Sequence, residues 1–287
     1  MTSIPRTPEH SLAPRRTPSA PQPGLVVLKL GGELLESAAG MRAMAAVVSA
    51  LSTTAPLVVV HGGGRAIDAE LRARGIEPRF VDGLRITDAP TLDIVVSVLA
   101  GRNNTAFVAA LYAAGARAVG LTGADAGIGL STRAALFTSA AGAQVDLGLV
   151  GQPCGMQAPL LLDLVELGYV PVVASIGVTG NGDLLNVNAD TLAGHLASTL
   201  GAARLIIAGR TAGVLDASGA PIDELSLETV DGMIASGDAH SGMVAKLSAC
   251  RVALEGGVAE VSIVGGRGLQ NFDNAPGTTI RPASVTA

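Results

Sequence analysis

Two apolar runs near the start of the chain each end in glycines. Residues 25–30 read Leu-Val-Val-Leu-Lys-Leu and precede a glycine pair, and residues 57–60 read Leu-Val-Val-Val and precede His61 and three glycines. Apolar residues at helical spacing follow each glycine cluster. A continuous apolar run that leads through glycines into a helix is typical of a buried parallel strand and its tight turn. The pattern therefore predicts two strand–glycine–helix units in close succession.

The rest of the chain alternates between strand and helix patterns. Further strands are predicted at residues 116–121, 170–174, 205–208 and 260–264. Helices are predicted at residues 91–114, 160–167, 192–200, 226–236 and 242–254. Irregular or hairpin structure is predicted at residues 80–88, short strands with glycine turns at residues 123–155, and an Asn-Gly hairpin turn at residues 179–183.

This alternation predicts an α/β fold, a three-layer αβα sandwich with a mainly parallel central sheet and helices on both faces. The pattern changes near residues 176–179, where we place a boundary between two lobes, residues 25–178 and residues 179–287. Residues 1–24 are rich in Pro, Ser, Thr and Arg and have no apolar periodicity. We expect this segment to be a disordered tail rather than a secretory signal.

Composition narrows the classes of function. Hydrophobic residues make up 48% of the chain but aromatic residues only 2%, which indicates a core of Ala, Val, Leu and Ile. The net charge of −5, without a long run of either sign, argues against nucleic acid or a membrane surface as a partner. No apolar stretch approaches the roughly 18 residues of a membrane-spanning helix. The two cysteines, Cys154 and Cys250, lack a metal-site spacing and indicate a reducing, cytoplasmic location.

Polar residues recur where predicted strands end and in glycine turns. They are Lys29, Arg85, Asn186, Asn188, Asp190 and Lys246, together with the backbone amides of Gly31, Gly32, Gly63 and Gly64. A lysine is rarely buried without a partner, and open α/β sheets bind ligands at the carboxyl ends of their strands. Two lysines, an aspartate and glycine amides are what phosphoryl transfer needs, because such a site must neutralise charge and hold donor and acceptor in line. The chain has no Ser-His-Asp spacing, no metal-ligand cluster and no G-x-x-x-x-G-K-[ST] loop.

Five segments resemble, in order, the signature segments of the amino acid kinase family. They are Lys29-Leu-Gly-Gly, His61-Gly-Gly-Gly, Asp82-Gly-Leu-Arg-Ile-Thr, Asn186-Val-Asn-Ala-Asp190 and Gly242-Met-Val-Ala-Lys246. The resemblance covers about residues 25–280. The Gly-Leu-Arg-x-Thr and Asn-x-Asn-Ala-Asp segments favour the N-acetylglutamate kinase branch over the branches that act on aspartate, carbamate or UMP.

The resemblance implies a reaction of ATP with N-acetyl-L-glutamate to give the γ-acyl phosphate, the second step of arginine biosynthesis. In that family, lysines that match Lys29 and Lys246 flank the transferring phosphoryl group, and an aspartate that matches Asp190 orients both. An arginine that matches Arg85 takes the α-carboxylate of the substrate, in keeping with the fit of a guanidinium fork to a carboxylate. The acceptor is already an anionic nucleophile, so no strong general base is expected.

The remaining roles that the resemblance implies are binding roles. Substrate-binding residues are expected to be Gly63, Gly64, Arg85, Asn186 and Asn188. Residues expected to bind ATP and its phosphates are Gly31, Gly32, Gly209, Arg210, Gly213 and Gly242. Magnesium is expected on the phosphates, largely through water and ATP oxygens.

The sequence departs from the family in its nucleotide half. Where the family usually has Leu-Thr-Asp-Val-x-Gly-Val, residues 207–214 read Ile-Ala-Gly-Arg-Thr-Ala-Gly-Val, so that Arg210 replaces the aspartate. The chain also lacks the terminal segments carried by arginine-inhibited, hexameric members. We therefore expect a homodimer built on the helix at residues 91–114 and insensitive to arginine.

Several alternatives stay open at this point. A related kinase could act on another blocked acidic substrate, such as N-succinylglutamate or carrier-linked α-aminoadipate, and a non-catalytic nucleotide-binding regulator could keep the same fold. A dinucleotide-dependent oxidoreductase is disfavoured because no G-x-G-x-x-G opens the first helix. Asp190 could also cap the helix that follows it. His61 is expected to pack and hydrogen-bond at its strand end rather than to transfer protons.

Overall fold

The computed structural model describes residues 23–139, 142–155, 159–216, 218–237, 239, 241–273 and 275–282, so the predicted tail lies outside it except for its last two residues. Its middle layer is an eight-stranded sheet in the order β14-β16-β15-β13-β1-β2-β10-β5. These strands are β1 (Val26–Leu30), β2 (Leu57–His61), β5 (Ala118–Thr122), β10 (Val170–Ala174), β13 (Arg204–Gly209), β14 (Glu224–Ser226), β15 (Glu260–Gly265) and β16 (Gly277–Arg281). All neighbours pair in parallel except β15 and β16.

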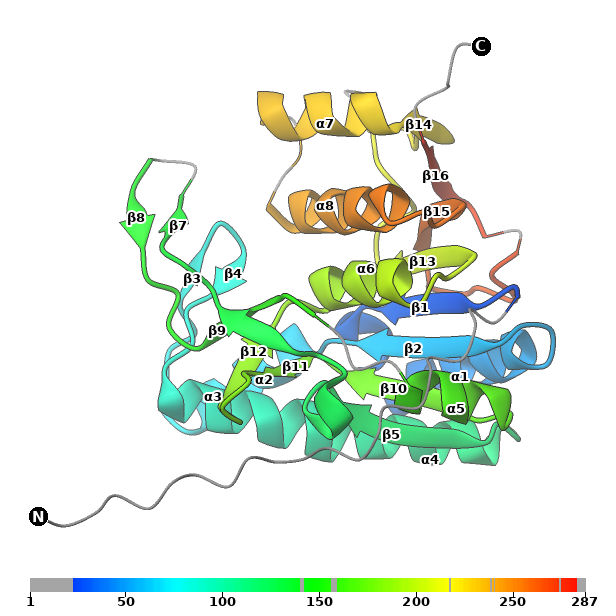
Figure 1. Ribbon diagram of the computed structural model, residues 1–287, viewed down its shortest axis with the longest axis horizontal. Coiled ribbons are helices and arrows are strands. Elements are labelled where there is room, and N and C mark those ends of the chain that lie inside the picture. Colours follow the sequence, from blue (N-terminus) through cyan, green and yellow to red (C-terminus); the bar gives the residue numbers. More distant parts are fainter. Residues whose placement is uncertain are drawn as a thin grey trace, which may run out of the picture.

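Helices cover both faces of this sheet (Figure 1). They are α1 (Ala38–Ser52), α2 (Gly64–Ala73), α3 (Ala89–Val96), α4 (Thr105–Ala113), α5 (Pro159–Glu166), α6 (Ala189–Thr199), α7 (Leu227–Ser236) and α8 (Ser241–Glu255). Strand β1 shows how the layers meet: Val26 and Leu28 pack with α1 and α4, whereas Val27 packs with α5, α6 and α8. The predicted αβα sandwich with a mainly parallel sheet is confirmed. The sheet takes strands from both sides of the predicted lobe boundary and joins them into one layer.

Smaller sheets lie beyond the carboxyl ends of β2 and β10 (Figure 1). Four strands form one of them, in the order β11 (Ile176–Val178), β12 (Leu184–Val187), β9 (Val150–Pro153) and β6 (Ser131–Arg133). Two hairpins pair β3 (Phe80–Val81) with β4 (Leu84–Arg85) and β7 (Phe137–Thr138) with β8 (Gln144–Val145). The predicted hairpins and the β-rich region are therefore present, and they place several polar segments over the strand ends.

The long predicted helix is continuous through three segments. Asp88 caps its start by accepting from the Thr91 amide, α3 leads into a π-helical stretch, η2 (Ser97–Asn104), and α4 completes it. By length and composition this helix is apolar enough to cross a membrane. The expectation that no apolar stretch approaches that length is therefore wrong. One of its faces packs on the sheet, where Phe107 and Leu111 are fully buried.

His61, the last residue of β2, is enclosed between the sheet and this helix. The Asn104 amide group donates to the Val172 carbonyl at 2.8 Å and contacts His61 Nε2 at 3.1 Å, while His61 Nδ1 lies 3.2 Å from the Gly62 carbonyl. Burial lowers the pKa of His61 to about 4, against a smaller opposing effect of the Gly62 hydrogen bond. The imidazole is therefore neutral at pH 7 and serves packing, as expected from the sequence.

Helices α6 and α8 pass each other closely at a glycine. A Cβ added at Gly194 in α6 would lie 2.6 Å from the Ala249 carbonyl oxygen and 2.9 Å from the Ala249 Cα in α8. Only a residue without a side chain permits this approach. The contact matters for the site described below because α8 also carries Lys246.

Substitution of Gly194 tests this close approach. Gly194→Ala should lower the free energy of unfolding by about 1–3 kcal/mol, because the methyl group would press on the backbone of α8. The matched control is Gly232→Ala in α7, where a Cβ meets nothing within 4 Å, and this variant should gain up to about 1 kcal/mol from helix propensity. Urea denaturation midpoints measure both. An equal gain in the two variants would contradict the packing argument.

The pKa of His61 predicts a pH-dependent stability. Between pH 6.5 and about 4 the unfolded chain binds a proton that the folded chain excludes, so this contribution to stability is complete above pH 6.5 and declines below it. From pH 7.5 to pH 5 the loss should be about 2 kcal/mol. His61→Gln should lack this component, so its urea midpoint should fall less than that of the wild type over the same range. If the urea midpoints of the two proteins fell equally between pH 7.5 and pH 5, the assignment of this pH dependence to His61 would be contradicted.

Candidate active site

The turns after β1 and β2 lie against each other at the carboxyl edge of the sheet. A Cβ at Gly32 would lie 2.6 Å from Gly63 Cα, so neither turn has room for a side chain here. Gly32 begins the short helix η1 (Gly32–Leu34) and Gly64 begins α2, positions where backbone amides lack a partner within the helix. The amide of Gly31 differs, because it donates to the Ala208 carbonyl at 2.8 Å. The expectation that the Gly31 amide serves a phosphate is therefore wrong.

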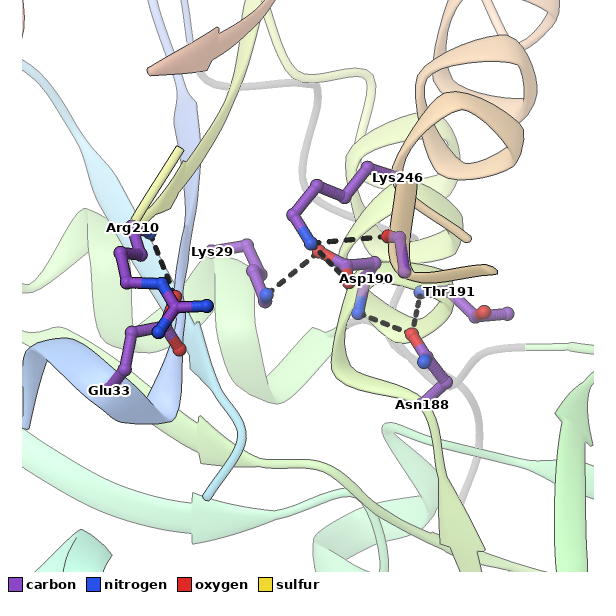
Figure 2. Close-up of polar contacts among 8 residues, drawn as sticks. Lys29, Glu33, Asn188, Asp190, Thr191, Arg210 and Lys246 are labelled. Carbon is purple, nitrogen blue, oxygen red and sulfur yellow. Dashed lines mark hydrogen bonds and ion pairs between the residues drawn. The ribbon is translucent and has the colours of Figure 1, made fainter. Parts of the chain in front are cut away.

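Lys29, Asp190 and Lys246 form an ion cluster in which Lys29 and Asp190 are buried and Lys246 is partly exposed. Lys29 Nζ lies 2.8 Å from Asp190 Oδ1, and Lys246 Nζ lies 3.7 Å from Asp190 Oδ2 and donates to the Gly242 carbonyl at 3.3 Å. Figure 2 shows the two lysines, one from β1 and one from α8, converging on the aspartate of α6. They are also the only two lysines in the chain, against 17 arginines. The predicted trio is thus brought together from three separate elements.

The start of α6 is capped by Asn188 rather than by Asp190. Asn188 Oδ1 accepts from the amides of Asp190 at 2.8 Å and Thr191 at 3.1 Å. The chain is extended at Asn188 and becomes helical from Ala189, which places Asp190 inside the first turn. The alternative that Asp190 caps this helix is therefore wrong. Its carboxylate is instead free to pair with the lysines, at the helix end where the macrodipole favours negative charge.

Arg85 is buried in the β3–β4 hairpin and already held by protein groups. Its Nη1 lies 2.7 Å from Asp68 Oδ1, its Nη2 donates to the Gly64 carbonyl at 3.3 Å, and its guanidinium lies over the Phe80 ring at 4.6 Å. Asp68 was not identified from the sequence. The available signal was its place one turn into the helix that follows the second glycine cluster. The pair fixes the plane of the guanidinium beside the glycine turns.

Asn186 is connected to the same hairpin. Its side-chain amide donates to Thr87 Oγ1 at 3.0 Å, and the Thr87 hydroxyl in turn donates to the Arg85 carbonyl at 3.1 Å. Thr87, in the middle of this chain of bonds, is fully buried. It ties β12 to the segment that carries Arg85.

Two cavities meet at this cluster. The smaller, of about 260 Å³, is lined by the predicted residues Lys29, Gly31, Gly32, Gly63, Gly64, Arg85, Asn186, Asn188, Asp190 and Lys246. The larger, of about 990 Å³, is lined by the predicted residues Arg210, Gly213, Gly242 and Lys246. Gly209 lies at the junction, where a Cβ would be 3.3 Å from Glu33 Oε1 and 3.9 Å from Lys246 Cε. Lys246 and Glu33 line both cavities, so the two spaces share a wall.

Glu33 was not identified from the sequence. Its Oε1 accepts from the Arg210 amide at 2.9 Å, which joins η1 to the loop after β13 (Figure 2). Arg65 also lines the larger cavity. With Arg210 and Lys246 it gives three cationic side chains in the lining, compared with two carboxylates, those of Glu33 and Asp216. A cavity of this charge suits a polyanion. With a second, smaller anion site across the lysine cluster, the arrangement can stabilise charge on a group that passes between two anions.

Comparisons with known proteins agree with this arrangement. Residues 24–265 match the amino acid kinase family. The acetylglutamate kinase of Symbiobacterium thermophilum is 40% identical over 247 residues, 84% of this chain and 84% of that protein. The acetylglutamate kinase of Methanopyrus kandleri is 39% identical, over 85% of this chain and 96% of that protein.

Solved structures give the same fold. The crystal structure of smu.665 from Streptococcus mutans superposes with a TM-score of 0.77 at 25% identity, over 90% of this chain and 98% of that one. N-acetylglutamate synthase from Neisseria gonorrhoeae reaches the same TM-score at 23% identity over 59% of its chain, a likeness of fold alone. With the family match and these relatives, the resemblance found in the five sequence segments is confirmed: the chain belongs to the amino acid kinase family.

Proposed function

We infer that the protein transfers the γ-phosphoryl group of ATP to the γ-carboxylate of N-acetyl-L-glutamate, giving N-acetyl-L-glutamyl 5-phosphate. This is the acetylglutamate kinase reaction, the second step of arginine biosynthesis. The observation that carries the inference is the Lys29–Asp190–Lys246 cluster, placed where two anion-binding cavities meet. The identity of about 40% to acetylglutamate kinases over most of the chain supports the choice of acceptor.

The lysine pair acts on the transferring group. Lys29 approaches from the smaller cavity, and Lys246 lies between both cavities. Charge spreads over the oxygens of the phosphoryl group in the transition state, and two ammonium groups at fixed positions stabilise it without reorganising. Asp190 pairs with both and fixes their positions. No base is required, because the acceptor carboxylate is ionised at pH 7.

We place the acceptor in the smaller cavity. The Arg85 fork, held by Asp68, offers its remaining N–H groups to the α-carboxylate. The amides of Gly32, Gly63 and Gly64 face the γ-carboxylate and the arriving phosphoryl group, as amides at helix starts do for anions. Asn186 and Asn188 complete the polar lining.

We place ATP in the larger cavity, beside Arg210, Gly213 and Gly242. Its volume of about 990 Å³ is at the upper end of small-molecule sites, which suits a nucleotide. Magnesium, when bound with ATP, neutralises phosphate charge. Among the described residues no group of three or more His, Cys, Asp or Glu side chains could cage a metal ion. We propose that phosphate oxygens and water would supply most of the ligands of the ion.

The two cavities support the proposal that the two halves of the chain bind different substrates. The acceptor site draws chiefly on residues 25–178 and the ATP site chiefly on residues 179–287, with the lysine cluster between them. We also propose a cytoplasmic location. Both cysteines are free, and Cys250 is fully buried, as in proteins of a reducing compartment.

The experiment that tests the function is an ADP-release assay with a panel of acceptors. N-acetyl-L-glutamate should be turned over, whereas N-succinylglutamate and carrier-linked α-aminoadipate should be much poorer. Lys29→Arg and Lys246→Arg keep the charge that Asp190 needs but displace it, and each should lower kcat by about 100-fold or more. The control Arg42→Lys, on the exposed face of α1, should be unaffected. No turnover of N-acetyl-L-glutamate would refute the proposal, and exclusive turnover of another acceptor would favour the related kinase.

We propose that the protein is a homodimer across the outer face of the long helix formed by α3, η2 and α4. That face presents small residues such as Gly101, Ala106 and Ala109 beside Tyr112, whose side chain is 81% exposed. Light scattering should give about twice the monomer mass of 28.5 kDa. Ala106→Glu should yield monomers, whereas Ala46→Glu on exposed α1 should not. A hexamer mass, or inhibition by arginine, would contradict the proposed assembly.

A further inference from the structure

We propose that Glu33 is a ligand of the divalent cation that accompanies the nucleotide, a role that rests on the proposed kinase function. Glu33 follows directly on the first glycine pair, in η1, and it lines both cavities. With Lys246 it flanks Gly209 at the junction between the cavities. A group in that place faces the phosphates that link donor to acceptor.

The carboxylate of Glu33 sits in a space that two glycines leave open. A Cβ at Gly31 would lie 2.5 Å from Oε1 and 2.6 Å from Oε2, and a Cβ at Gly209 would lie 3.3 Å from Oε1. Oε1 is fixed by the Arg210 amide at 2.9 Å. In the described part of the chain, Oε2 has no hydrogen-bond partner. One oxygen is thus anchored and the other is available, the usual condition of a carboxylate that binds a metal ion.

A free carboxylate at a polyanion site needs an explanation in terms of charge. Arg65, Arg210 and Lys246 make the larger cavity attractive to phosphates, but Glu33 repels them unless a cation intervenes. Glu33 would hold a divalent cation here, and the positive charge of that cation would turn this repulsion into attraction. Magnesium in nucleotide enzymes is commonly held by one or two carboxylates together with substrate phosphates. One protein carboxylate at this junction fits that pattern.

The departure at Arg210 fits the same account. The sequence carries Arg210 where the resemblance leads one to expect an aspartate, and the backbone amide of Arg210 donates to the carboxylate of Glu33. The negative charge at the junction thus comes from Glu33, in the turn after β1. A purely structural Glu33 would need only its hydrogen bond to Arg210, so the two roles can be separated.

Glu33→Gln separates them, because the glutamine carbonyl can still accept from the Arg210 amide but is a weak magnesium ligand. The matched control is Asp216→Asn. Asp216 lines the same cavity, and its Oδ1 accepts from the Ser218 and Ala220 amides, bonds that asparagine can keep. Both substitutions remove one negative charge from the cavity and preserve the local hydrogen bonding.

The measurement is calorimetric binding of a non-hydrolysable ATP analogue, with magnesium and with EDTA. In the wild type, magnesium should tighten binding on the order of tenfold or more. Glu33→Gln should lose most of this increment and bind the metal-free analogue at least as well, whereas Asp216→Asn should retain the increment. The electron paramagnetic resonance spectrum of Mn²⁺ with the analogue should likewise differ between wild type and Glu33→Gln.

The contrary outcomes are distinct. An unchanged increment in Glu33→Gln, or an equal loss in Asp216→Asn, would overturn the role of Glu33 while leaving the kinase function intact. Absence of analogue binding to the wild type under both conditions would overturn the proposed function, and this proposal with it.

Discussion

The buried contact between Asp190 and its two lysines is the constraint on which the site depends. Asp190 lies within 3.7 Å of both ammonium groups and is the acid that both lysines share. Removing one partner of a buried pair typically costs about 3–5 kcal/mol, because a charge is left without compensation. The cluster therefore ties β1, α6 and α8 together while holding positive charge ready for an anion. Stability of the fold and readiness of the site rest on the same three side chains.

Close approaches of backbone make this arrangement possible. The absence of a side chain at Gly194 lets α8 reach α6, and the absence of one at Gly32 lets the turns after β1 and β2 touch. Around them, the acceptor groups are held before any ligand arrives: Arg85 by Asp68, and Asn186 through Thr87. Because these groups are already fixed, ligand binding loses little free energy to ordering their side chains.

The sequence predicted most of the central sheet and the lysine cluster because those parts have strong local patterns. Strands β14 and β16 were missed, since both are partly polar and both depend on pairing between residues far apart in the chain. A capping role for Asp190 was left open by the sequence, and only the backbone conformation shows that Asn188 takes that role. The roles of Glu33 and Asp68 depend on partners in other elements of the fold. The partner of Glu33, Arg210, is 177 residues away in the chain. Patterns within a short segment of sequence cannot reveal contacts between residues that are far apart in the chain.

The restriction of lysine to positions 29 and 246 has a practical consequence. Every side-chain primary amine in the chain belongs to the buried cluster, and the rest of the surface presents its positive charge as guanidinium. Amine-directed reagents therefore meet no competing lysines, and the extent of lysine modification, counted apart from the α-amino group, becomes a direct measure of how open that cluster is. Labelling, cross-linking or immobilisation through lysine would act as an occupancy probe of the cleft rather than as a neutral modification of the surface.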